Sequence, residues 1–141
     1  MHDPFNLLRF VEAQRPVFSR VMEELRAGRK TSHWMWFIFP QLQGLGHSEM
    51  ARRFAISGAA EARAYLLHDV LGPRLEESLS TLLQHRDKSA LAILGHPDDL
   101  KLRSCLTLFA SIKPEQPLFQ QALDQFFAGA PDTRTLSLLE E

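Results

Sequence analysis

The sequence predicts an all-α protein, a single compact bundle of about eight short helices around a central aromatic helix. Several segments carry apolar residues at helical spacing. Proline, glycine and capping residues recur at short intervals along the chain. Only residues 34–39 could form a buried strand, and no second run of that kind could pair with them. The length of 141 residues favours one domain over positions 1–141.

The aromatic helix is expected within residues 29–41, RKTSHWMWFIFPQ, which contain both tryptophans. Aromatic side chains bury about 150–250 Å² each, so this segment belongs at the centre of the core. Thr31 or Ser32 is expected to cap the helix, and Pro40 to end it.

Two helices precede this segment. Asp3, followed by proline, is expected to cap the first, and the second restarts at Pro16 and ends at Gly28. The apolar residues of the second helix are spaced i, i+1, i+4, i+5 and i+8, which places them on one side of the helix. They are Val17, Phe18, Val21, Met22 and Leu25.

A loop with two glycines, residues 41–47, follows the aromatic segment. Ser48 is expected to start the next helix, and another should run from Ala59 to about His68. A long helix is expected after that, with five leucines on its buried face. They are Leu71, Leu75, Leu79, Leu82 and Leu83.

The C-terminal part predicts a brief turn capped by Ser89 and three further helices. The first begins near Pro97, the second carries an apolar stripe over residues 118–127, and Asp132 caps the last. The first of these has one apolar face. It comprises Leu102, Cys105, Leu106, Phe109 and Ile112.

Composition limits the classes of function. A net charge of −1 argues against a nucleic-acid or membrane-surface binder, which would carry a broad basic excess. The single cysteine, Cys105, excludes an internal disulfide and favours a reducing cytoplasm. We see no signal peptide and no membrane-spanning run. The six histidines do not have metal-ligand spacing, so no metal site and no cofactor are expected.

Five phrases of the chain resemble one protein family: RFVEAQ, AGRKTSHWMWFIFPQLQGLG, MARRFAI, EARAYLLHDVLGPRL and PDDLKLRSCLTLF. That family is domain of unknown function 1810, and the resemblance runs from about Phe5 to Leu139. It implies a mostly helical fold among uncharacterised, mostly bacterial proteins, and it implies no activity. Where the family usually has SSMTLF, this chain has Ser104-Cys105-Leu106-Thr107-Leu108-Phe109, which argues against Cys105 as a nucleophile shared by the family. Some members are labelled calpastatin; calpastatin itself is long and disordered, so the label says little about a compact chain.

The candidate ligand-binding residues surround the aromatic segment and the glycine loop. Cations on both sides, a histidine beside two tryptophans and a glutamine leaving the core could together hold an anion and a flat ring. The candidates are Lys30, Ser32, His33, Trp36, Gln41, Arg52 and Arg53. The alternative interpretations are solvated basic patches, a histidine at the edge of the core and a glutamine that caps a helix.

The candidate catalytic residues are His33, Asp98 and Asp99. An imidazole or a pair of carboxylates can act as general acid and base. Acidic residues in a first helical turn also interact favourably with the helix dipole, so the two aspartates have a simpler interpretation.

Three hypotheses for function remain open. The first is binding of a small anionic ligand, such as a nucleotide or a ribose phosphate. The second is an enzyme that acts on a nucleotide-like or ADP-ribose-like compound. The third is a protein-interaction module with an exposed apolar groove.

Overall fold

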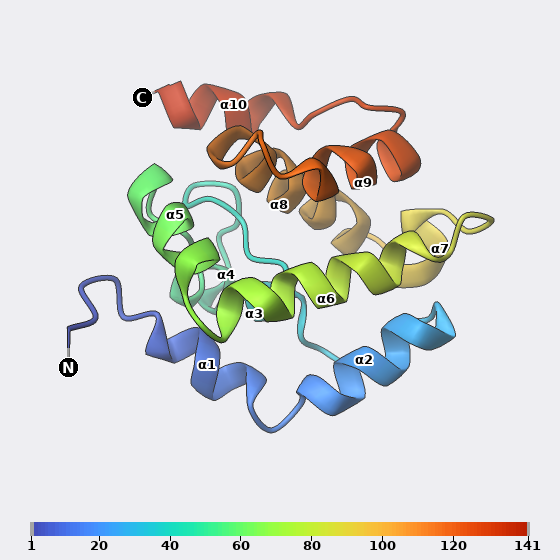
Figure 1. Ribbon diagram of the computed structural model, residues 1–141, viewed down its shortest axis with the longest axis horizontal. Helices are drawn as coiled ribbons and strands as arrows, with labels where there is room; N and C mark the ends of the chain where they lie inside the picture. The colour runs from blue at the N-terminus through green and yellow to red at the C-terminus, as the bar shows by residue number, and fades with distance from the viewer. Residues whose placement is uncertain (1, 141) are drawn as a thin grey trace.

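The computed structural model describes residues 2–140, and over these residues the protein is all-α, as predicted (Figure 1). Ten helices form within residues 2–140, two more than the eight or so expected. They are α1 (Leu8–Gln14), α2 (Phe18–Ala27), α3 (Met35–Ile38), α4 (Glu49–Arg53), α5 (Ala59–Leu67), α6 (Leu71–Leu83), α7 (Ala90–Leu94), α8 (Asp98–Ile112), α9 (Pro117–Phe127) and α10 (Thr133–Glu140). None of the helices described is long and apolar enough to cross a membrane.

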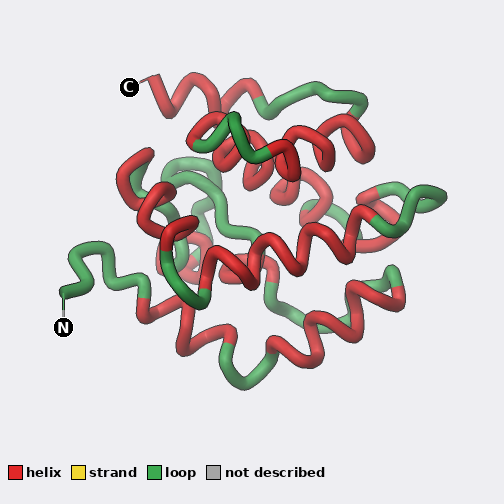
Figure 2. The backbone as a smooth tube through the Cα atoms, in the orientation of Figure 1, coloured by secondary structure: helices red, strands yellow, loops and turns green. Residues whose placement is uncertain are grey.

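Helices α6 and α8 hold the bundle together. Helix α6 packs against α2, α5 and α9, and α8 packs against α5, α7, α9 and α10. The short aromatic helix α3 lies behind α6 in the view of Figures 1 and 2, and packs against α1. Long loops, green in Figure 2, connect α2 to α3 and α3 to α4.

The core contains a continuous series of aromatic rings. The ring centroids of Phe10 in α1 and Tyr65 in α5 are 5.1 Å apart, with the planes nearly perpendicular. Tyr65 lies 5.6 Å from Phe109 of α8, and Phe109 lies 5.6 Å from Phe119 of α9. Edge-to-face and tilted contacts at these distances are the favourable arrangements of aromatic pairs. The series therefore joins four helices, from α1 near the start of the chain to α8 and α9 near its end.

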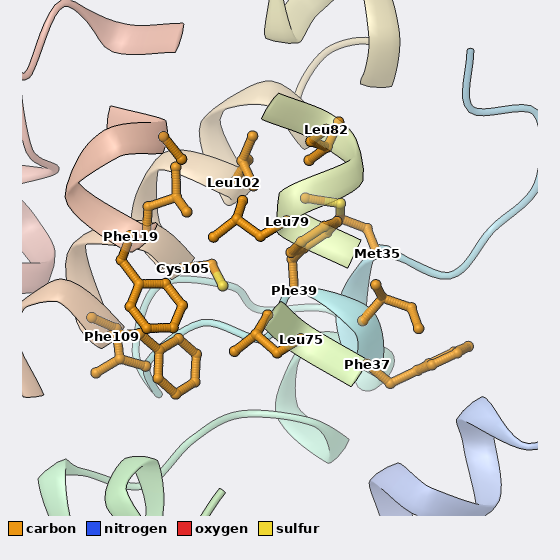
Figure 3. Close-up of a cluster of buried hydrophobic side chains, with 14 of the residues drawn as sticks. Met35, Phe37, Phe39, Leu75, Leu79, Leu82, Leu102, Cys105, Phe109 and Phe119 are labelled. Carbon is orange, nitrogen blue, oxygen red and sulfur yellow. The ribbon is translucent and has the colours of Figure 1, made fainter. Parts of the chain in front are cut away.

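Leucines of α6 occupy the middle of this core, as their spacing predicts. Leu75 and Leu79 lie between Phe39 and the helix α8 in Figure 3. Cys105 of α8 is fully buried beside them, and burial raises the pKa of its thiol. A buried neutral thiol is a small apolar side chain with little reactivity.

Three predicted side-chain caps are present. The predicted cap at Asp3 is wrong, because α1 begins only at Leu8 and has no side-chain cap; the Asp3 carboxylate instead accepts from the amides of residues 7 and 8, at 2.8 and 3.0 Å. The hydroxyl of Ser48 accepts from the amide of residue 51, and that of Ser89 from the amide of residue 92. The carboxylate of Asp132 accepts from the amide of residue 135 at 3.0 Å. Short polar side chains therefore fix where several of the helices begin.

The predicted cap of the aromatic helix is wrong. Helix α3 has only four residues and begins after Trp34, with no side-chain cap. The amides of Thr31 and Ser32 and the hydroxyl of Ser32 instead donate to Glu24 of α2. Pro40 does end the segment, as expected.

We predict that Gly72→Ala destabilises the protein. A Cβ atom on Gly72 would lie 2.2 Å from the carbonyl oxygen of Leu66, where α5 turns into α6. The backbone would have to shift, so the free energy of unfolding should fall by about 1–3 kcal/mol. Chemical denaturation measures this change. The matched control is Gly58→Ala, because no atom lies within 4 Å of a Cβ at that extended position; an equal loss in both variants would contradict the prediction.

Candidate functional site

The two tryptophans of the aromatic segment have different environments. Trp34 is 1% exposed, and its indole Nε1 donates to Glu24 at 2.9 Å. Trp36 is half-buried, and no hydrogen bond from its indole forms within residues 2–140. The aromatic segment therefore has one closed side and one side that solvent reaches.

The closed side depends on the carboxylate of Glu24. It accepts from the amide of Thr31 at 2.8 Å, from the amide of Ser32 at 3.1 Å, and from the Ser32 hydroxyl at 2.5 Å. With the Trp34 indole, these donors form what we call the Glu24 network. Burial disfavours the charged carboxylate, but the hydrogen bonds outweigh burial and lower the pKa of Glu24 to about 2.

Sequence reasoning missed Glu24, although a signal was present. Glu24 lies three residues after Val21 and directly before Leu25, both of which are fully buried. A carboxylate on the apolar side of an amphipathic helix needs donors from elsewhere in the chain. That requirement indicates a buried polar network without identifying the donors.

Three charged residues form a second group beside the tryptophans, which we call the lysine cluster. Lys30 Nζ lies 2.9 Å from Asp98 Oδ2, and Lys101 Nζ lies 3.7 Å from Asp98 Oδ1. Lys30 also lies 5.1 Å from the ring centroid of Trp34, and Lys101 lies 5.5 Å from that of Trp36. Two ammonium groups share one carboxylate, so the cluster leaves one positive charge next to the aromatic segment.

The glycine loop and α4 enclose an open hollow of about 380 Å³, the glycine-loop hollow. Two backbone hydrogen bonds close the base of this loop: the Gln43 amide donates to the Ile56 carbonyl at 2.8 Å, and the Ile56 amide donates to the Gln41 carbonyl at 3.0 Å. The residues that line the hollow are Gln43, Gly44, Gly46, His47, Arg52 and Ala55. Arg52 forms no ion pair within the described part of the chain, and its side chain is exposed.

A smaller cavity adjoins this hollow. Trp36, Gln41 and Lys101 line it together with apolar residues, and its volume of about 10 Å³ is close to that of one water site. Gly46 lies between the two cavities, because it lines the hollow while a Cβ on it would lie 2.6 Å from Ala51 Cβ and 3.1 Å from Gln41 Nε2, and these two residues line the small cavity. The side chains at this contact thus form the shared wall of both cavities.

The structure brings four of the predicted ligand-binding residues to this region. Trp36 and Gln41 line the small cavity, Arg52 lines the hollow, and Lys30 belongs to the lysine cluster. Lys101 and His47 join them, and neither was among the predicted ligand-binding residues. Their proximity arises from how α8 and the glycine loop pack.

The other ligand-binding candidates lie apart from the two cavities. Ser32 belongs to the Glu24 network, and His33 is exposed and forms no hydrogen bond through its ring within residues 2–140. The Arg53 guanidinium lies 5.1 Å from the ring centroid of Phe54, and the Arg53 carbonyl accepts from Arg9.

The two candidate carboxylates at the start of α8 bond to different partners. Asp98 pairs with the two lysines of its cluster, whereas Asp99 Oδ1 lies 3.1 Å from His96 Nδ1. This separation fits ion pairing and a favourable interaction with the helix dipole in the first turn of α8 more closely than a shared proton between two carboxylates. In residues 2–140, no three side chains of His, Cys, Asp or Glu come together as a metal-binding group.

A family model described as protein of unknown function (DUF1810) matches residues 4–139. The chain belongs to this family. It is also similar to the crystal structure of a conserved hypothetical protein from Mycobacterium tuberculosis, at 52% identity, with 99% of each chain covered and a TM-score of 0.97. No curated protein matches the chain. Neither description assigns an activity, so the site must be interpreted from its own chemistry.

We predict that the Glu24 network makes stability depend on acid pH. The pKa of Glu24 is about 2 in the folded protein, below the ordinary value of 4.5, so the ionised carboxylate stabilises the fold above pH 4.5. This contribution, about 3 kcal/mol at neutral pH, should be lost as the pH falls from 4.5 towards 2.

Glu24→Gln tests this prediction, because it keeps the shape of the side chain and removes the charge. The variant should be less stable than the wild type at pH 7, and the difference should shrink below pH 4.5. Urea denaturation at a series of pH values measures both effects. Glu23→Gln is the control, since Glu23 is exposed on the same helix; a difference between Glu24→Gln and wild type that stays constant with pH would contradict the assignment.

Proposed function

We propose that this family member binds a small anionic ligand that carries a flat ring, such as a nucleotide. A ribose phosphate would bind more weakly at the same place, because it lacks the ring. The observation that carries the proposal is that Trp36, Gln41 and Arg52, from three different segments, line two adjoining cavities. We include in this proposal that the protein is located in the cytoplasm, which its single cysteine favours.

The ring of the ligand would stack at Trp36. This indole is half-buried and therefore held in place, while its open side remains available to solvent. Base–aromatic stacking contributes about 1–3 kcal/mol per base in proteins that bind single-stranded nucleic acid. The Lys101 ammonium lies over the Trp36 ring, 5.5 Å from its centroid, and places a positive charge beside the ligand.

The anionic end would lie in the glycine-loop hollow. The volume of about 380 Å³ falls within the usual range for small-molecule sites. A guanidinium binds phosphate or carboxylate through two parallel hydrogen bonds, and Arg52 has no internal ion pair in the described residues to compete with that role. His47 lines the same hollow and offers a further nitrogen donor.

The geometry supports binding more than catalysis. An enzyme acting on a nucleotide-like or ADP-ribose-like compound needs an acid or base within hydrogen-bond reach of the substrate. His33 is exposed and lines neither cavity, and Asp98 is held between two lysines. No observation therefore favours the enzyme as a second candidate.

Isothermal titration with AMP and with ribose 5-phosphate tests the proposal. We expect the wild type to bind AMP more tightly, and Arg52→Ala to weaken both ligands by about tenfold or more through the loss of a charge-assisted contact. Trp36→Leu should weaken AMP and leave ribose 5-phosphate nearly unchanged, because only AMP has a ring to stack.

Arg86→Ala is the control, since Arg86 is exposed in the connection after α6 and lines neither cavity. A thermal shift should accompany binding, because a ligand at 100 times its dissociation constant adds about 2.7 kcal/mol. Equal affinity in wild type, Arg52→Ala and Trp36→Leu would contradict the proposed site, and absence of binding to either ligand would contradict the proposed function.

A further inference from the structure

The tip of the glycine loop, residues 44–47, is held without hydrogen bonds. Two backbone bonds close the base of the loop, but within residues 2–140 none forms at its tip. Yet Gly44, Gly46 and His47 of this tip line the glycine-loop hollow. A segment without hydrogen bonds keeps one shape only where other contacts restrain it. The shape of the hollow therefore depends on what packs against the tip.

Each part of the tip packs against a different element. Leu45 packs against the core, and Gly46 lies close to Ala51 of α4. Leu138 of α10 covers Gly44: a Cβ on Gly44 would lie 3.5 and 3.7 Å from the two methyl carbons of Leu138. Apart from the residues that flank Gly44, no other atom of the described chain lies within 4 Å of that Cβ position. On this side the loop therefore rests on α10 alone.

The point that Leu138 covers is one of high conformational freedom. Gly44 has a φ of +101°, in the left-handed region that favours glycine. Glycine has the widest range of backbone conformations, and it has no side chain with which to anchor itself. A contact from outside the loop is therefore needed to keep this part of the tip in one conformation.

Helix α10 is itself anchored to α8. The Asp132 amide donates to the Thr107 hydroxyl at 2.8 Å, and the Ser104 hydroxyl donates to the Asp132 carboxylate at 3.2 Å. Thr135, in the first turn of α10, is fully buried. The helix therefore begins at a fixed point on the core and carries Leu138 to the loop about one turn later.

We propose that α10 is a clasp for the glycine loop, with Leu138 as the positioning residue. Leu138 does not line the hollow, so it acts on a ligand only through the loop. The claim about the loop concerns the free protein. The claim about affinity rests on the proposed function, because a loop that samples several conformations has to be ordered again when a ligand binds.

Backbone amide relaxation, measured by NMR on the free protein, tests the clasp. In the wild type the order parameters of residues 44 and 45 should be near the rigid-backbone value of about 0.85, and in Leu138→Ala they should fall to about 0.6 or below. Leu138→Met should restore them, because methionine has nearly the volume of leucine. Circular dichroism checks that Leu138→Ala keeps its helices.

Leu139→Ala is the matched control. Leu139 is the next residue of α10 and is also half-buried against the core, but none of its atoms lies within 4 Å of the Cβ position of Gly44. The same group is removed from the same helix, so a general loosening of α10 would appear in both variants. The clasp is overturned if Leu138→Ala leaves the order parameters unchanged, or if Leu139→Ala lowers them equally.

Isothermal titration tests the link between the clasp and the ligand site. Leu138→Ala should weaken AMP and ribose 5-phosphate by the same factor, about two- to tenfold, because the hollow would receive the anionic end that both ligands share. Lowered order parameters with unchanged affinities would overturn this link. If the wild type binds neither ligand, the proposed function fails, and the relaxation measurements decide the clasp by themselves.

Discussion

The arrangement of the whole aromatic segment depends on one buried carboxylate. Glu24 of α2 accepts four hydrogen bonds from a stretch seven to ten residues later in the chain. The Trp34 indole is buried away from water, and a buried donor without a partner costs about 1–3 kcal/mol. By accepting the four hydrogen bonds, Glu24 fixes where the loop after α2 turns inward and how Trp34 enters the core. The adjacent Lys30 is thereby directed towards α8, where it meets Asp98.

The helices were predictable where local chemistry decides them. Leucines at helical spacing identified the buried side of α6, and Ser48 and Ser89 identified where chain segments begin to turn. The aromatic helix was predicted too long, because the choice of its first residue is not local. Ser32 has the chemistry of a cap, but Glu24 is a charged acceptor and takes both its amide and its hydroxyl. The local sequence does not show whether Ser32 caps the helix or donates to Glu24, because that depends on how α2 packs against the following loop.

The candidate site was predictable only in part, for a similar reason. Trp36, Gln41 and Arg52 stand out because aromatic, amide and basic groups gather near one loop in the sequence. Lys101 lies 65 positions after Trp36 and comes close only through the packing of α8. His47 faces the same hollow as Arg52 because the pairing of residues 41–43 with Ile56 folds the loop back on α4. Long-range contacts of this kind leave no pattern in the local sequence.

The different environments of the two tryptophans follow from where α3 begins. Trp34 precedes the helix, with non-helical backbone angles (φ −143°, ψ 5°), whereas Trp36 lies within it. The Trp34 indole bonds to Glu24, Trp36 lines the small cavity, and each has a lysine near its ring. Asp98 links the two lysines and restrains both. An anion that approaches Trp36 would meet a lysine already held in position but only partly neutralised, so little side-chain entropy would be lost on binding. The Asp98 contacts of the closed side thus also hold Lys101 beside the open side.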